Sequence, residues 1–169
     1  MMKKELRNKG FSLIELIVIV AIMGVMLAVG GYSLTAILSA NAKQCAKELE
    51  AGLISTRTQS YSRDTSGTIA TVSFYKGADG IYMEKSYETE TKKIGGSKVI
   101  VKYKLTGGPT DGVALGGDPL TFSFDRSSAA FRPTTVNGTS AMCEWIKIIS
   151  GTKVYTITCY EYTGKTLLE

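Results

Sequence analysis

The apolar residues divide the first sixty positions of the chain into two stretches. Residues 11–29 are almost wholly apolar, and Glu15 is the single charged residue among them. From residue 34 the apolar positions recur at steps of three or four, the spacing of one face of an α-helix. They are Leu34, Leu38, Ala42, Cys45, Leu49, Leu53 and Thr56. No proline precedes Pro109, so the pattern predicts one helix from Ser12 to Ser60. Its first half is expected to be apolar all round and its second half amphipathic.

Beyond residue 60 the pattern changes to short runs of β-branched and aromatic residues, which are typical of strands. Strands are predicted at residues 69–75, 81–85, 97–105, 120–124, 144–149 and 154–160, with a short partner at 129–131. Asp79-Gly80 and Gly151-Thr152 are expected to form hairpin turns, whereas residues 106–119 and 132–142 are expected to be loops. The predicted fold class is α+β: a long N-terminal helical spine whose second half packs against an antiparallel β-sheet head.

Charge and composition narrow the range of functions. The chain has 169 residues and a net charge of +5, of which the first ten residues supply +3, so its basicity is a weak argument for nucleic-acid binding. The sequence contains no histidine, which excludes imidazole-based catalysis and histidine metal sites. We therefore expect no enzymatic activity, no cofactor and no metal.

The apolar run suits a membrane span better than a secretory signal. Its 19 residues exceed the roughly 7–15 of a signal-peptide core and approach the roughly 20 of a membrane helix. The basic residues before it are expected to keep the N terminus on the cytoplasmic side. A carboxylate such as Glu15 is costly inside a bilayer and is therefore usually functional. The alternative is an acid that extends its side chain to the membrane surface.

The segment GFSLIELIVIVAIMGVMLAV, preceded by MMKKELRNK, resembles the N terminus of type IV pilins and the related pseudopilins. This resemblance implies that prepilin peptidase cleaves between Gly10 and Phe11 and that the new amino group of Phe11 is methylated. It also implies that Glu15 pairs with the Phe11 amine of a neighbouring subunit in a filament. The expected partners are further copies of the chain, other pilins, the peptidase and, before assembly, the membrane; no specific nucleic acid is expected. The protein is expected at the cytoplasmic membrane as a single-pass precursor and then at the cell surface.

The resemblance implies four segments and leaves two functions open. Residues 1–10 are a cleaved leader, 11–31 a transmembrane and filament-core helix, 32–60 the amphipathic helix of the head, and 61–169 the β head. Gly30 and Gly31 are expected to make the helix flexible or, alternatively, to allow close helix packing. The expected function is the structural subunit of a type IV pilus. The alternative is a minor pilin or pseudopilin of a secretion or DNA-uptake system, because residues 120–134 and 145–165 weakly resemble the last strands of H-type minor pseudopilins.

The pairing of the three cysteines, Cys45, Cys143 and Cys159, remains open. The resemblance to pilins with a C-terminal disulfide-closed loop implies a bridge between Cys143 and Cys159. A two-residue turn at Gly151-Thr152, however, puts Cys159 on the core face and predicts Cys143 on the opposite face, just outside the strand. Cys45, on the inward stripe of the helix, could pair with either cysteine, or all three could be free.

Overall fold

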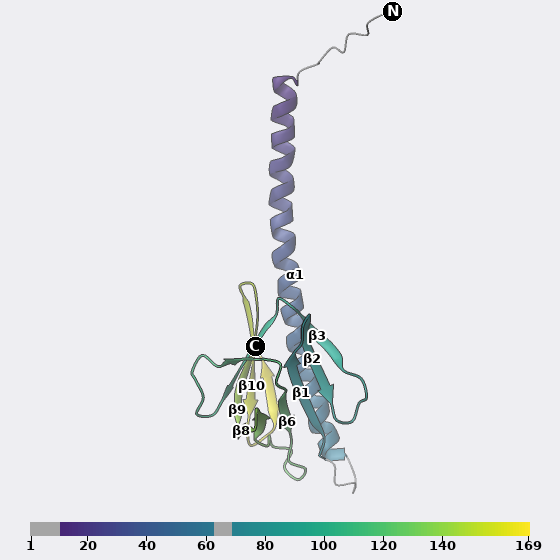
Figure 1. The fold of residues 1–169 in the computed structure, drawn as a ribbon, viewed down its shortest axis with the longest axis vertical. Helices are drawn as coiled ribbons and strands as arrows, with labels where there is room; N and C mark the ends of the chain where they lie inside the picture. Colours follow the sequence, from purple (N-terminus) through teal and green to yellow (C-terminus); the bar gives the residue numbers. More distant parts are fainter. Residues whose placement is uncertain (1–10, 63–68) are drawn as a thin grey trace, which may run out of the picture. The chain divides into compact units, whose positions relative to one another are not determined.

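The computed structural model describes residues 11–62 and 69–169; for residues 29–37 it describes the backbone only. The helix α1 spans Leu13–Ser62, which confirms the predicted helix, and it passes through Gly30 and Gly31 without interruption (Figure 1). The chain divides into two compact units, Met1–Ala36 and Ile37–Glu169, which are described separately below.

The described part of the first unit is a helix whose apolar side chains are all exposed. Its large apolar residues range in exposure from 43% at Ile19 to 78% at Phe11 and Leu27. Such a continuous apolar surface on an isolated chain indicates a site of association with another surface. Among the described residues, no helix meets the combined requirement of length and apolar character for crossing a membrane.

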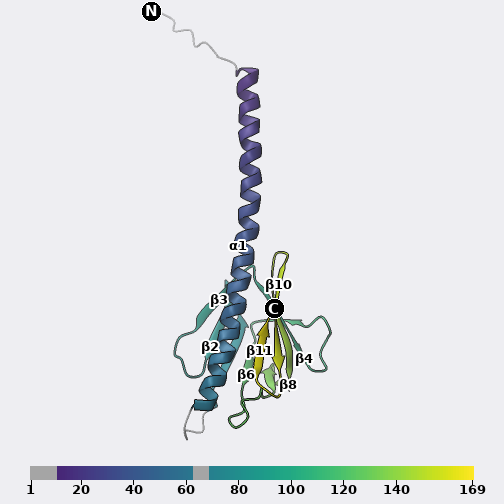
Figure 2. The ribbon, with the colours of Figure 1, turned by 180° about the vertical axis from the view of Figure 1, so that it is seen from behind.

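The second unit contains two antiparallel sheets rather than the single sheet that the sequence predicts. The first sheet has the order β3-β2-β1-β6-β7-β8. Its strands are β1 (Thr71–Lys76), β2 (Gly80–Lys85), β3 (Lys92–Gly96), β6 (Leu120–Ser123), β7 (Thr134–Val136) and β8 (Thr139–Ala141). Both views of the ribbon place β2 and β3 beside the last turns of α1 (Figures 1 and 2).

The second sheet has the order β11-β10-β9-β4-β5. Its strands are β4 (Ile100–Leu105), β5 (Val113–Ala114), β9 (Cys143–Ser150), β10 (Lys153–Tyr160) and β11 (Lys165–Leu168). Ser150 lies opposite Lys153, which confirms the two-residue turn at Gly151-Thr152. Gly151 has a φ of 59°, the left-handed conformation that a tight hairpin of this kind requires.

Several segments differ from the prediction. Residues 132–142, expected to be a loop, contain β7 and β8, joined by a turn in which Asn137 and Gly138 both have positive φ. Asn-Gly between two short runs is a type I′ hairpin signal, and it outweighs the polar composition of the segment. The strands β3, β5 and β11 were not expected, because their short sequences lack a clear alternating pattern. Residues 129–131 contribute only an isolated bridge between Phe131 and Phe124.

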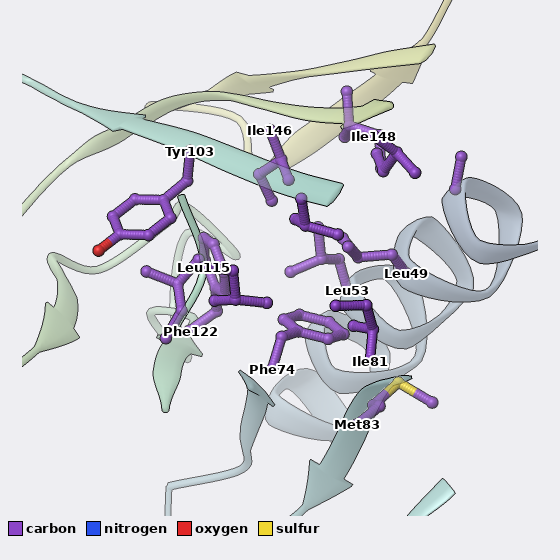
Figure 3. Close-up of a cluster of buried hydrophobic side chains, with 14 of the residues drawn as sticks. Leu49, Leu53, Phe74, Ile81, Met83, Tyr103, Leu115, Phe122, Ile146 and Ile148 are labelled. Carbon is purple, nitrogen blue, oxygen red and sulfur yellow. The ribbon is translucent and has the colours of Figure 1, made fainter. Parts of the chain in front are cut away.

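The predicted inward stripe of the helix forms one wall of the core. Its buried members are Ala42, Cys45, Leu49, Leu53 and Thr56. Figure 3 shows Leu49 and Leu53 between Ile81 and Phe74 of the first sheet and Ile146 and Ile148 of the second. Gly52 allows this close approach, because a Cβ at this position would collide with the sulfur of Met83. Burial of about ten such large apolar side chains, each worth roughly 1.5–3 kcal/mol, holds the helix against both sheets.

Candidate processing and assembly site

The N terminus of α1 is closed by reciprocal hydrogen bonds between Ser12 and Glu15. The backbone N–H of Glu15 donates to the Ser12 hydroxyl at 3.3 Å, and the backbone N–H of Ser12 donates to the Glu15 carboxylate at 3.2 Å. The Ser12 hydroxyl also donates to the same carboxylate oxygen at 3.4 Å. This is the capping-box arrangement, in which a serine before the helix and an acid three residues later satisfy two otherwise unpaired N–H groups.

The capping box gives the carboxylate of Glu15 a local role in the single chain. A negative charge in the first turn also interacts favourably with the positive end of the helix dipole. Glu15 is exposed, so its carboxylate can reach a cation on another molecule at the cost of opening the cap. Phe11, one residue before the cap, is 78% exposed. Gly10, the predicted residue before the cleavage site, lies outside the described residues.

The predicted helix begins at Ser12, but no capping role was predicted for this residue. Ser12-Leu13-Ile14-Glu15 is a serine followed three residues later by glutamate at the start of an apolar run. That spacing is itself a helix-start signal and could have identified Ser12. The position of Glu15 at the start of an apolar segment therefore has one local physical reason, the cap, and its pairing in a filament stays a prediction.

The glycines of the apolar helix remain candidates for flexibility or packing. The helix continues through Gly30 and Gly31, whose surroundings lie outside the described side chains. A Cβ at Gly24 would meet nothing within 4 Å in the single chain. The backbone is therefore helical at all three glycines, and their role in flexibility stays a prediction.

A β-bulge turns Cys143 into the core, contrary to the expectation that it faces away. Lys104 lies opposite Trp145, but Leu105 lies opposite Cys143, so Glu144 is an extra residue in the strand. An extra residue reverses the alternation of side chains on one side of it. As a result Cys143 is buried, at 5% exposure, on the same side as Ile146.

The bulge brings Cys143 to Cys159, which is also buried. Both are free thiols. Interaction with the neighbouring Cys159 thiol, together with burial, raises the pKa of Cys143 well above its usual range. The carbonyl of Trp145 also accepts a bond from the Cys143 sulfur at 3.6 Å. The structure thus places together the two cysteines that the resemblance to pilins paired.

Cys45 is a free thiol, fully buried on the helix beside Gly95 of β3. Burial, followed by the nearby charge of Glu48, raises the pKa of Cys45 to about 12. A thiol that stays protonated is a poor nucleophile, so this site is chemically inert at neutral pH.

The comparison with protein families supports the resemblance of the N terminus. Residues 6–31 match a family model described as the prokaryotic N-terminal methylation motif. The match supports the resemblance of the chain to type IV pilins and pseudopilins, and the helix with an exposed apolar first half, the capped acid at its start and the β head are consistent with it. No curated protein and no solved structure matches the chain.

Proposed function

We propose that the chain is a structural subunit of a type IV pilus, processed by prepilin peptidase and polymerised through its N-terminal helix. The observation that carries this proposal is the apolar surface of residues 11–28, where thirteen large apolar side chains are each at least 43% exposed. A surface of this kind requires an apolar environment, either lipid or the same surface of other subunits. The precursor is proposed to occupy the cytoplasmic membrane and the mature chain a surface filament.

Assembly is proposed to exchange one partner of Glu15 for another. In the single chain the carboxylate accepts hydrogen bonds from Ser12. In the filament it would accept from the methylated amine of Phe11 on a neighbouring subunit. A buried carboxylate paired with a cation is tolerated, whereas an unpaired one is strongly disfavoured. Only the correct axial position of the incoming helix therefore satisfies Glu15, which makes it a register device rather than a catalyst.

The mature N terminus tests the processing step. Mass spectrometry of the natural product is expected to show a chain that begins at N-methylated Phe11, without residues 1–10. The chain as translated serves as the mass reference. A natural product that retains its leader would contradict the proposal.

A minor pilin or pseudopilin is the second candidate, favoured by the resemblance of residues 120–134 and 145–165 to minor pseudopilin strands. A structural pilin and a minor pilin would share the same processing and helix packing. Their copy number in the fibre is therefore the property that distinguishes them. A dominant subunit of sheared surface fibres would be the structural pilin. A few copies at the fibre end, or none, would favour the minor protein. Neither function needs catalysis, and we propose none.

The two buried cysteines of the β9–β10 region are proposed to form a disulfide once the head is outside the cytoplasm, where oxidants maintain such bonds. The neighbouring thiols of Cys143 and Cys159 support this pairing. Closing a loop of roughly 15 residues would stabilise the head by about 3 kcal/mol. Peptide mapping of the natural protein is expected to join Cys143 to Cys159 and to recover Cys45 as a thiol.

The Cys45→Ala variant is the matched control for this prediction, since it removes the thiol that should not react. It should keep the same linked peptide. A bridge that contains Cys45, or a natural protein with three thiols, would refute the pairing.

A further inference from the structure

Three aliphatic side chains form a row on the outer face of the second sheet. Ile149 lies opposite Ile100 on one side and opposite Val154 on the other. Ile100 is 46% exposed and Val154 is 52% exposed. They point away from the core, into which the alternating residues Val101 and Ile148 project. Single exposed aliphatic residues are common on protein surfaces, but adjacent ones on three strands form a patch.

Two lysines continue this face in the next row of the sheet. Lys102 and Lys147 lie directly opposite each other. Like charges in this position destabilise a sheet. Among the described residues neither lysine forms an ion pair, whereas the adjacent Lys104 binds Glu144 at 2.6 Å. The fold therefore accepts an electrostatic cost at this pair that a carboxylate from another molecule would relieve.

We define the basic-aliphatic face as Ile100, Lys102, Trp145, Lys147, Ile149 and Val154. An apolar patch beside charged residues is the usual composition of a protein interface, and tryptophan is enriched at the centre of such interfaces. A nucleic acid fits this face poorly. The ammonium of Lys147 lies 4.3 Å from the centre of the Trp145 ring. It therefore covers a face of the ring on which a base would stack.

The chain itself presents carboxylates of the required kind at the turn between β2 and β3. We define the acidic turn by Glu84 and Glu90, which are both exposed. The pairing of β2 with β3 ends at Met83 and Lys92, so Glu84 and Glu90 lie beyond the last paired residues, on either side of the turn. Within the described ranges neither carboxylate forms an ion pair, although the nearby Glu88 binds Lys85 at 2.8 Å.

We propose that the basic-aliphatic face of one head binds the acidic turn of a second copy of this chain. The views in Figures 1 and 2 place β2 and β3 on one side of the head and β9 and β10 on the other. A contact between two different surfaces of identical subunits leaves both surfaces free at the ends and propagates into an open helical filament. The proposal deepens the proposed function, on which it rests, by naming the surfaces through which the heads meet.

Charge reversal and its compensation test the contact in cells that make the natural fibre. Lys102→Glu with Lys147→Glu should lower the yield of sheared fibres at least about tenfold, because acids then face acids. Glu84→Lys with Glu90→Lys should lower it similarly. The chain that carries all four substitutions should recover most of the yield, which also shows that the altered residues allow folding.

The matched control is Lys76→Glu with Arg132→Glu, which changes the charge equally at exposed positions outside both surfaces and should assemble normally. Normal yields from both reversed pairs, or no recovery in the fourfold variant, would overturn the contact. A third outcome would also overturn the contact: Lys102→Glu with Lys147→Glu abolishes binding of oligothymidine by the full chain but leaves the fibre yield unchanged. The face would then bind nucleic acid and not a second head. Absence of fibres from the unaltered chain would instead contradict the proposed function itself.

Discussion

Replacing Glu15 by valine is expected to abolish filament assembly while the head stays folded. Removal of one partner from a buried charge pair costs about 3–5 kcal/mol. Since about 1.4 kcal/mol is a tenfold change in an equilibrium constant, the fibre yield should fall at least about a hundredfold. The same substitution lowers the cost of placing the helix in lipid, so the membrane-bound precursor should remain abundant. Quantifying the chain in sheared fibres and in membranes measures both effects.

Two further variants separate the charge of Glu15 from its capping role. Glu15→Gln keeps a residue that can complete a capping box but removes the charge, so it should fail to assemble like the valine variant. Ser12→Ala keeps the carboxylate and removes a cap worth about 1 kcal/mol that assembly gives up in any case, so the yield should not fall. Normal assembly of Glu15→Gln together with failure of Ser12→Ala would assign the residue to helix capping alone.

Replacing Gly10 by leucine is expected to leave the leader attached to nearly all of the chain. A residue without a side chain lets an extended backbone enter a protease cleft closely, and a leucine at that position would obstruct it. Without cleavage Phe11 has no free amine, so fibres should also be absent. Intact mass of the membrane-bound protein reports the retained leader directly.

Gly24→Leu is the matched control for the cleavage prediction. It makes the same chemical change within the helix, where a Cβ meets nothing within 4 Å in the single chain. Its leader should be removed normally. A normally processed Gly10→Leu chain would show that the cut lies elsewhere.

The helix was predictable because its causes are local. An apolar run, an inward stripe with helical spacing and the absence of proline before Pro109 specify Leu13–Ser62 to within two residues. The buried residues Cys45, Leu49 and Leu53 were predicted by the same period. The cap at Ser12 was also written in the sequence, although the interpretation considered only the charge of Glu15.

The strands were predictable where alternation was strong and not where it was weak. The β1–β2 and β9–β10 hairpins carry alternating apolar residues and turn signals. By contrast β11 reads Lys-Thr-Leu-Leu and β3 reads Lys-Lys-Ile-Gly-Gly, so their strand conformation depends on pairing with β10 and β2. A short polar segment adopts whichever conformation its neighbours can hydrogen-bond.

The sequence by itself determined the long helix, its apolar and amphipathic halves, the charge at its start and the methylation motif, because each depends on residues within a few turns of one another. The tertiary structure decided the division into two sheets, the inward turn of Cys143 and the juxtaposition of Lys102 with Lys147. The physical reason is strand register: a single extra residue, Glu144, reverses which side chains meet, and only pairing between distant strands selects that register.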